Sequence, residues 1–304
     1  MSSCESTVAI VILTCDQRDL ALTCLRSLYT SAGFQHIIVI DNGSRDGTAD
    51  AIEGEFPSVH VIRSATNLGV AGGRNLGIQR ALDLEADYVW ILDNDTVVPP
   101  GAPQALLHYM SRHPDVGIAA ATVCWGSEPT TIWSTSGQLQ WLLGEARHPE
   151  RGMPYDSLKA PESEAAFISG CNMFVRAEVF RRCGLLDERF FYGYEDVDLS
   201  LRARSIGYRL VSLRSPMILH YHQSALGTIS PLKVYFGVRS RFLFMELHAP
   251  RWLWFAFCIA WLVQFLTRYA PGRFLRGDTA SVRAAYWGLR DYVTRRWAYP
   301  SNLE

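Results

Sequence analysis

The sequence predicts an α/β fold, with a mostly parallel central sheet flanked by helices and a C-terminal helical extension. Apolar runs without alternating polar positions, typical of strands buried on both faces, recur in the first half of the chain. Segments with helical spacing separate them, and this alternation is typical of βαβ units. With 304 residues and 48% hydrophobic content, the chain is long enough for one large domain and an appendage, expected at 1–230 and 231–304.

The predicted strands and helices alternate through the first third of the chain. Buried strands are expected at 8–13, 37–40, 59–63 and 88–92, and helices at 20–29, 48–55 and 73–84. Later segments predict strands at 167–176 and 210–213, with a helix that opens on acidic residues between them. Right-handed crossovers bring the carboxyl ends of parallel strands to one edge, where such sheets bind ligands. We therefore expect Thr14, Asp41, Asn67 and Asp93 along that edge.

The fourth of these strands stops on two carboxylates, Asp93 and Asp95, which are one residue apart. Oxygen ligands of this kind suit Mg²⁺ or Mn²⁺, which take one or two protein carboxylates and complete their shell with water and substrate phosphate. The Asp-Asn-Asp sequence suits an ordinary turn as well. It does not suit a calcium loop, because Val97 occupies the third ligand position and no glycine follows in register.

A glycine-rich stretch at residues 67–75, Asn-Leu-Gly-Val-Ala-Gly-Gly-Arg-Asn, follows the third strand. Glycine lets a backbone approach a ligand closely, and the helix that follows presents free N–H groups to a phosphate. Arg74 adds a positive charge of fixed geometry. The spacing is not that of a dinucleotide-binding fingerprint, and a tight turn without a ligand is the alternative.

An acidic cluster, Glu195, Asp196 and Asp198, opens a helix directly after the aromatic segment 190–194. Carboxylates stabilise helix N-termini by about 0.3–1 kcal/mol, so the cluster has an ordinary structural explanation. Like charges this close together also raise one another's pKa, which suits a general base. The aromatic rings suit a wall for a sugar or a base, and equally a core.

The total charge of −1 hides an asymmetry. Residues 231–304 hold 11 Lys and Arg against 4 Asp and Glu, a net charge of about +7, whereas the preceding residues hold 18 against 26, about −8. We therefore expect no nucleic acid partner for the body and an anionic surface as the partner of the tail. The seven cysteines include no C-x-x-C pair, which predicts a reduced cytosolic setting without a zinc site. No signal peptide is expected before the first strand.

After a predicted helix at 235–247, residues 252–269 are apolar nearly all round. A spanning helix needs about 20 apolar residues, so an interfacial helix or a packed helix pair is favoured over a span. Tryptophans near its start suit a lipid headgroup boundary, and several arginines follow. We expect residues 251–304 to make a peripheral contact with the inner face of the cell membrane.

Taken together, these motifs resemble those of the family 2 glycosyltransferases of GT-A fold. The resemblance extends over residues 7–225 and rests on Thr14, VIDNGSRDGT (39–48), NLGVAGGRN (67–75), DND (93–95), GYEDVDLSLR (193–202) and His220. It is greatest to the bacterial branch that includes rhamnosyl- and galactofuranosyltransferases. It implies an inverting transfer from a dTDP- or UDP-linked sugar, with rhamnose as one candidate, to a hydroxyl of a cell-surface glycan or lipid-linked saccharide.

The resemblance also implies roles for individual residues. The implied donor contacts are Thr14, Asp41 on the pyrimidine base, Arg74 on base and phosphate, Asp93 near the ribose, and Asn94. The implied ligands of Mg²⁺ or Mn²⁺ are Asp95 and His220, with His222 as a substitute for His220. Asp196 matches the general base and Glu195 a supporting acid.

The chemistry agrees with these roles, because breaking a sugar–phosphate bond leaves negative charge that a divalent ion stabilises, while one base takes the acceptor proton. A nucleotidyltransferase stays open, although it would need a glycine-rich loop with a basic residue where Thr14-Cys15-Asp16-Gln17 stands. A non-catalytic nucleotide-sugar-binding homologue also stays open. Acceptor contacts are expected from the aperiodic residues 125–165, and homo-oligomerisation is left open.

Overall fold

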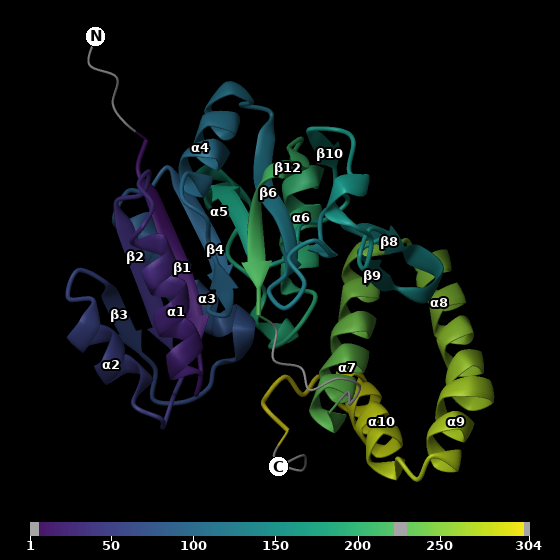
Figure 1. Ribbon diagram of the computed structural model, residues 1–304. Helices are drawn as coiled ribbons and strands as arrows, with labels where there is room; N and C mark the ends of the chain where they lie inside the picture. The colour runs from purple at the N-terminus through teal and green to yellow at the C-terminus, as the bar shows by residue number, and fades with distance from the viewer. Residues whose placement is uncertain (1–5, 222–229, 301–304) are drawn as a thin grey trace.

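The computed structural model describes residues 6–221 and 230–300, and its centre is a ten-stranded sheet with helices on both faces (Figure 1). The strand order along the main path is β10-β12-β6-β11-β4-β1-β2-β3. The four strands at the β3 end are parallel, as are β6 and β12, while β11 is inserted antiparallel between β4 and β6. The expected α/β class, with its parallel core and flanking helices, is confirmed.

The strands of this sheet, with the separate hairpin β8-β9, are β1 (Val8–Thr14), β2 (His36–Asp41), β3 (His60–Arg63), β4 (Tyr88–Asp93), β5 (Thr96–Val97), β6 (Val116–Trp125), β7 (Ile132–Ser134), β8 (Gln138–Gln140), β9 (Glu145–Arg147), β10 (Glu162–Glu164), β11 (Asn172–Arg176) and β12 (Arg209–His220). The helices are α1 (Arg18–Leu28), α2 (Thr48–Glu55), α3 (Gly69–Asp83), α4 (Ala102–Arg112), α5 (Ala177–Cys183), α6 (Glu195–Ser205), α7 (Pro231–His248), α8 (Arg251–Gln264), α9 (Ala270–Leu275) and α10 (Thr279–Val293).

The two faces of the sheet are buried in two separate cores. In β1, Val8, Ile10 and Ile12 pack with α1, α2 and α4 on one face, and Ala9 and Val11 pack with α3, α5 and α6 on the other. This follows from the alternation of side chains along a strand. Because both faces of the sheet are covered, every residue of such a strand meets a core, and the strands read as unbroken apolar runs rather than as alternating patterns.

Helix α3 lies unusually close to the sheet. A Cβ atom at Gly77 would approach the side chains of Ile40 and Val11 to 2.4 and 2.5 Å, far inside contact distance. The close packing brings the start of α3, with its glycine-rich turn, over the carboxyl ends of β1 and β2. Glycine at 77 is therefore a packing requirement that helps to position the candidate phosphate-binding turn.

Several elements differ from those predicted. The strand expected at 167–176 begins only at Asn172, because residues 167–171 leave the sheet to approach the acidic cluster. The strand expected at 210–213 continues to His220, since pairing of β12 with β6 resumes after an irregularity between Leu213 and Met217. The helix expected from residue 73 begins at Gly69. Residues 125–165, which show no periodicity in the sequence, contain the short strands β7 to β10.

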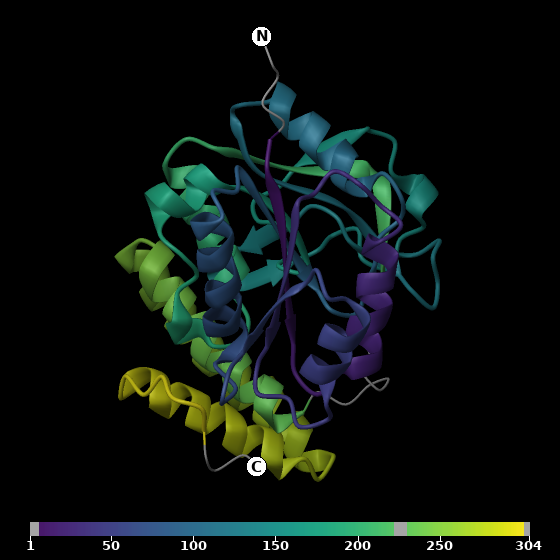
Figure 2. The same cartoon turned by 90° about the vertical axis from the view of Figure 1, so that its left-hand side faces the viewer.

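The C-terminal helices lie beside the carboxyl ends of the strands (Figure 2). Helix α7 is attached to the body by Ser240, whose hydroxyl donates to the carbonyls of Phe190 and Tyr192 at 3.1 Å each. Helix α10 packs along α7, and the Tyr235 hydroxyl donates to Asp291 at 2.9 Å. Helix α8 leans away from α7 and continues into α9 through a π-helical turn, Phe265–Tyr269.

Candidate active site

The carboxyl ends of β1, β2 and β4 open on a cavity of about 380 Å³. Four of the residues expected to contact the donor line it: Thr14, Arg74, Asp93 and Asn94. The Asn94 amide donates to Thr14 Oγ1 at 3.0 Å and to Gln17 Oε1 at 2.9 Å, which ties the end of β4 to the end of β1. These side chains therefore lie together at the carboxyl ends of the strands, as predicted from the topology of a parallel sheet.

Asp41 lies beside this cavity in a different position. It is buried, and its Oδ1 accepts a hydrogen bond from the Ser44 backbone N–H at 2.8 Å. The neighbouring Asn42 lines the cavity instead, and its amide donates to Asn67 Oδ1 at 3.0 Å. Asn42 Oδ1 accepts from the Leu68 N–H, so this side chain holds the glycine-rich turn in place. Contact between Asp41 and a nucleotide base stays a prediction.

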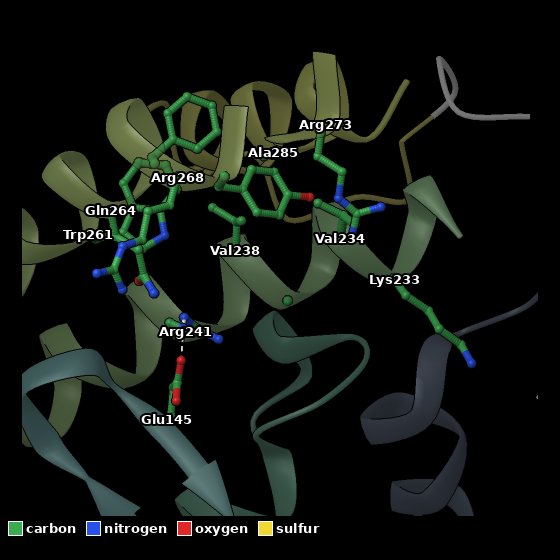
Figure 3. Close-up of a pocket in the computed structure, with 13 residues that line it drawn as sticks. Glu145, Lys233, Val234, Val238, Arg241, Trp261, Gln264, Arg268, Arg273 and Ala285 are labelled. Carbon is green, nitrogen blue, oxygen red and sulfur yellow. Dashed lines mark ion pairs between the residues drawn. The ribbon is translucent and has the colours of Figure 1, made fainter. Parts of the chain in front are cut away.

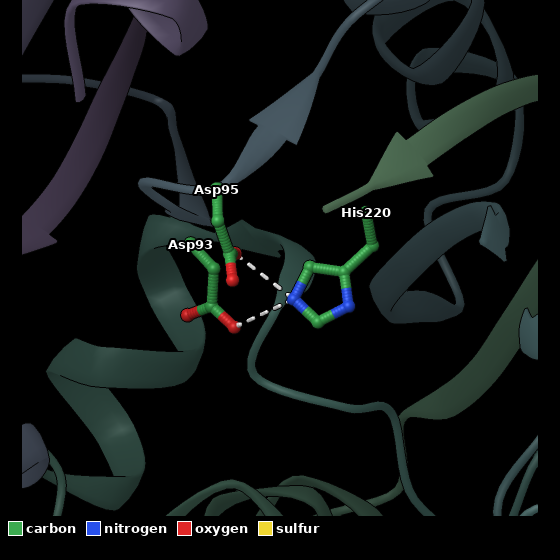
Figure 4. A group of neighbouring side chains, drawn as sticks. All are labelled: Asp93, Asp95 and His220. Atoms are coloured by element: carbon green, nitrogen blue, oxygen red, sulfur yellow. Dashed lines mark ion pairs between the residues drawn. The ribbon is translucent and has the colours of Figure 1, made fainter. Parts of the chain in front are cut away.

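Asp93, Asp95 and His220 form a compact group of ligand atoms (Figure 4). Asp93 ends β4, Asp95 follows in the turn to β5, and His220 ends β12, which pairs with β5. His220 Nε2 lies 2.9 Å from Asp95 Oδ1 and 3.8 Å from Asp93 Oδ2. His222, the other histidine considered, lies outside the described residues.

The geometry of this group fits a small divalent cation. One nitrogen and one carboxylate oxygen from each aspartate offer ligand atoms within 4.8 Å of one another. Neighbouring ligands of an octahedral ion with bonds of about 2.1 Å lie about 3 Å apart, as Nε2 of His220 and Oδ1 of Asp95 do. Asp95 Oδ1 is buried and receives no hydrogen bond of good geometry from the described residues. The two carboxylates suit Mg²⁺ and Mn²⁺, and the imidazole nitrogen, a ligand of transition metals, favours Mn²⁺ of the two.

Arg74 connects the strand-end carboxylates to the acidic helix. Its side chain is 5% exposed, and its guanidinium binds Asp93 at 2.6 Å, Glu195 at 3.2 Å and the Gly170 carbonyl at 2.9 Å. Burial lowers the pKa of Arg74, but the surrounding carboxylates outweigh this effect and raise it. Arg74 is therefore a permanent cation between two acidic groups that are far apart in the sequence.

The acid pair at the start of α6 consists of Glu195, which is buried, and Asp196, which is half-buried. Burial, followed by repulsion from Asp196, raises the pKa of Glu195 to about 7, although Arg74 acts in the opposite direction. Burial also raises the pKa of Asp196, against two backbone N–H groups that stabilise its carboxylate. The pKa of Glu195 thus lies near neutral pH, where a general base operates best, and that of Asp196 is shifted in the same direction.

The position of Asp196 depends on Gly170. The Gly170 N–H donates to Asp196 Oδ2 at 2.8 Å, while the Val197 N–H donates to Oδ1 at 2.8 Å. A Cβ at residue 170 would lie 2.4 Å from Nη1 of Arg74 and 3.3 Å from Cβ of Asp196. Only glycine allows the loop to support both charged side chains at once.

Asp198, the third member of the acidic cluster, has a structural role. It accepts hydrogen bonds from His248 of α7 at 2.8 Å and from Arg202 at 2.8 Å. Burial would raise the pKa of Asp198, but these two partners outweigh burial and lower it. Its carboxylate joins α6 to the end of α7, so the cluster divides into one structural and two candidate chemical residues.

Residues of the C-terminal helices also line the donor-side cavity. These are Leu232, Lys233 and Phe236 from α7 and Tyr299 from the segment after α10. Phe236 stacks on Phe191 with ring centroids 4.9 Å apart, and the Tyr299 ring lies 5.4 Å from that of Phe191. Sequence reasoning did not include these residues in the site, because the tail was treated as a separate appendage. The run of rings at 190–194 was the one available signal.

Residues 125–165 supply an aromatic wall beside His220. The Trp133 ring meets the His220 ring edge-on at 4.3 Å, and Arg151 lies over Trp133 at 4.6 Å. His148 packs against Trp133 and Phe167. Burial lowers the pKa of His148 to about 4, so it is neutral at physiological pH.

Comparison with known protein families gives one match over most of the body. The model of glycosyl transferase family 2 matches residues 9–184. The N-acetylglucosaminyl-diphospho-decaprenol L-rhamnosyltransferase of Mycobacterium tuberculosis is 26% identical over 238 residues, which cover 71% of this chain and 76% of that protein. The galactofuranosyltransferase GlfT1 of Mycolicibacterium smegmatis is 36% identical over 218 residues, covering 70% of each chain.

Solved structures share the fold at lower identity. A crystal structure of GalNAc-T7 with UDP, GalNAc and Mn²⁺ matches with a TM-score of 0.60 at 15% identity. The match covers 77% of this chain and 48% of that chain. It confirms the fold class predicted from the sequence.

Proposed function

Because the chain belongs to glycosyl transferase family 2, in the branch of its rhamnosyl- and galactofuranosyltransferase relatives, we propose that it transfers a sugar from a dTDP- or UDP-linked donor, with inversion, to a hydroxyl of a cell-surface glycan or lipid-linked saccharide. Rhamnose is the proposed donor sugar, since a relative is named for its transfer. The observation that carries the proposal is the position of Arg74. Its guanidinium contacts Asp93 at 2.6 Å and Glu195 at 3.2 Å, and so joins the strand-end carboxylates to the acidic cluster.

The donor is proposed to lie in the 380 Å³ cavity at the strand ends. Its lining supplies Thr14 and Asn94 as polar contacts and the rings of Tyr192, Phe236 and Tyr299 as surfaces for stacking. The start of α3 presents backbone N–H groups, which favour a phosphate. We propose that residues 1–230 hold the catalytic machinery and that 231–304 complete the wall of this cavity.

The divalent cation is proposed to be held by Asp95 and His220, with Asp93 beside them. Such an ion supplies Lewis-acid stabilisation of the charge that develops on the leaving diphosphate. The chain's own residues orient the site. Arg74 keeps the Asp93 carboxylate in a fixed position, and the Trp133 ring packs against His220. The carboxylates fit Mg²⁺ and Mn²⁺ alike, and the imidazole favours Mn²⁺.

Asp196 is proposed as the general base, with Glu195 as a supporting acid that tunes the local field. The two backbone N–H groups on Asp196 leave lone pairs for one further proton, and burial raises its pKa, which makes the carboxylate a stronger base. A single base opposite the leaving group favours direct displacement, which inverts the anomeric carbon. Asp196 would take the acceptor proton as the new glycosidic bond forms.

The tail is proposed to contact the inner face of the cell membrane. One helical segment in the described residues, Arg251–Leu275, is long and apolar enough to cross a membrane by length and composition, and 17% of its apolar 18-residue window is buried. Its exposed apolar residues recur at helical spacing on one face: Trp252, Phe255, Ile259, Leu262 and Leu266. Because α10 packs along α7, and α7 and Tyr299 line the donor cavity, a peripheral contact is favoured over a span.

A panel of nucleotide sugars tests the proposed function. With Mn²⁺ and a saccharide acceptor, we expect release of nucleoside diphosphate from a dTDP- or UDP-sugar. A nucleotidyltransferase would instead release pyrophosphate from a nucleoside triphosphate and a sugar phosphate. A non-catalytic homologue would bind the nucleotide sugar, detected by thermal shift, without releasing nucleoside diphosphate when acceptor and metal are supplied. Either of these results would overturn the proposal.

A further inference from the structure

A second cavity, of about 450 Å³, lies between α7 and the segment formed by α8, the π-helical turn and α9 (Figure 3). Three aromatic residues contribute to its walls: Trp261, Phe265 and Tyr269. Four cations also line it: Lys233, Arg241, Arg268 and Arg273. Glu145 is the single acidic residue among the lining residues. We call this space the α7–α8 cavity.

The positive charge of the α7–α8 cavity is only partly neutralised. Arg241 lies 3.6 Å from Glu145, and Arg273 binds Asp278 at 2.6 Å. Within residues 6–221 and 230–300, neither Lys233 nor Arg268 forms an ion pair with an acidic side chain. Two cations therefore remain available to an external anion. A partly enclosed space strengthens their attraction, because fewer waters screen it.

The α7–α8 cavity adjoins both halves of the candidate active site. Lys233 lines this cavity and the donor-side cavity alike. On the opposite wall, Glu145 follows Gly144, whose carbonyl accepts a hydrogen bond from the Tyr194 hydroxyl at 2.7 Å. Tyr194 immediately precedes Glu195 and Asp196. A molecule held in this cavity would thus sit beside the segment that carries the proposed base.

One wall of the α7–α8 cavity continues onto an exposed apolar surface. Trp261 and Phe265 line the cavity, and their sequence neighbours Leu262 and Leu266 are 51% and 59% exposed on the outer side of the same helical segment. An apolar chain leaving the cavity over this segment would meet hydrophobic surface rather than water. The cavity and the surface together suit an amphiphile with an anionic head and an apolar tail.

We propose that the α7–α8 cavity binds the acceptor where its lipid and its saccharide are joined by phosphate or diphosphate. The phosphate would lie between Arg268 and Arg241, the apolar chain would pass along α8, and the sugar would extend towards Asp196. This assignment rests on the proposed function, because it takes the acceptor to be lipid-linked. On this assignment, the α7–α8 cavity selects a phosphate-bearing lipid over a free glycan.

Gly237 offers a direct way to block the α7–α8 cavity. It lies within α7 and lines the cavity, and a Cβ placed there meets no atom within 4 Å. Gly237→Leu should therefore fold, with a gain in helix propensity, and fill the space. Gly272→Leu is its control, since Gly272 lies in α9 outside the lining and its added Cβ also meets nothing within 4 Å. Arg268→Glu and Arg276→Glu form a second matched pair, of which only Arg268 lines the cavity.

The binding experiment uses geranylgeranyl diphosphate as the probe and the full chain as the protein. We expect Gly237→Leu and Arg268→Glu to weaken probe binding at least about tenfold, while Gly272→Leu and Arg276→Glu stay within about twofold of wild type. Geranylgeraniol and inorganic diphosphate should each bind much more weakly than the probe. Affinity for dTDP or UDP with Mn²⁺ should be unchanged in all four variants.

Three results would overturn the assignment. The first is unchanged probe affinity in Gly237→Leu, and the second is binding of inorganic diphosphate as tight as that of the probe. The third is displacement of the probe by phosphatidylglycerol vesicles at equal lipid concentration, which would make the cavity a membrane headgroup site. Failure of the proposed function is a distinct result, because the wild-type protein would then release no nucleoside diphosphate from a nucleotide sugar when metal and acceptor are supplied.

Discussion

Arg74 Nη2 lies 2.6 Å from Asp93 Oδ1, and this buried contact joins the donor edge of the sheet to the acidic helix α6. The other terminal nitrogen of the same guanidinium contacts Glu195 at 3.2 Å. Residues 74, 93 and 195 therefore form one charged unit, although they belong to three elements. The chemistry proposed for the two carboxylate groups depends on the position of this single cation.

Replacing Arg74 should damage stability and donor binding together. Arg74→Gln leaves the buried Glu195 and the half-buried Asp93 without their cation, and breaking a buried pair costs up to about 3–5 kcal/mol. Arg74→Lys retains the charge but cannot contact both carboxylates as a planar fork, so an intermediate loss is expected. Urea denaturation measures the free energy of unfolding. An Arg74→Gln variant as stable as wild type would show that the contact is incidental.

Removing Asp95 should abolish the effect of metal on donor binding. Asp95→Ala takes away one ligand of the proposed site, so the gain in nucleoside diphosphate affinity caused by Mn²⁺ should fall more than about tenfold. Titration calorimetry with and without Mn²⁺ measures that gain. Asp156→Ala is the control, because this side chain is 95% exposed and remote from the site. An equal gain in Asp95→Ala and wild type would exclude Asp95 as a ligand.

The stability of the protein should depend on the charge of Glu195. Its pKa is raised from 4.5 to about 7, so between these pH values the folded state keeps a proton that the unfolded chain has lost. The free energy of unfolding should consequently fall as pH rises through this window. Glu195→Gln should lack this contribution. Across the window, the free energy of unfolding of the wild type should therefore fall by roughly 3 kcal/mol more, at most, than that of the variant.

Urea denaturation of both proteins at intervals from pH 5 to pH 8 measures this difference. His148 acts in the opposite direction, because its lowered pKa reduces stability as pH falls below 6.5. His148 is present in both proteins, so its contribution cancels when their free energies of unfolding are compared at each pH. Parallel stability curves for wild type and Glu195→Gln would mean that Glu195 is ionised in the folded state across the range.

The exposed face of α8 should drive association with membranes. Replacing Phe255, Ile259 and Leu262 by Ser removes three apolar side chains that are 51–66% exposed, so the fold should survive. Partition into anionic liposomes should fall at least about tenfold. The control carries Ser at Leu76 and Met153, two exposed apolar residues of the body. Equal loss in both variants would show that the effect is not specific to α8.

The strand-end residues were the most predictable part of the site. Asp93, Asp95 and Asn94 follow an apolar run, and the carboxyl ends of parallel strands meet by topology, so their meeting with Thr14 needed no knowledge of packing. His220 was harder, because β12 is irregular between Leu213 and Met217 and its end could not be located from the spacing. The resemblance to the family, rather than periodicity, pointed to His220.

Other features depended on packing that the sequence does not display. Lys233 and Tyr299 reach the donor-side cavity because α7 and α10 pack together, and no local pattern marks either residue. Asp198 has the same residue type as Asp196 and belongs to the same acidic cluster. The hydrogen bond from His248 to Asp198 is what gives Asp198 a structural role. The α7–α8 cavity arises from the angle at which α8 leaves α7, which helical periodicity cannot predict.

The most direct test of the account compares Asp196→Asn with Glu195→Gln in one assay of nucleoside diphosphate release at saturating acceptor. Asp196→Asn keeps the shape and its neighbours but cannot accept the acceptor proton, so turnover should fall by about 10²- to 10⁴-fold while donor affinity changes less than about twofold. Glu195→Gln should cost less. Near-normal turnover in Asp196→Asn, or a loss of donor binding as severe as in Asp95→Ala, would contradict the assignment of Asp196 as the base.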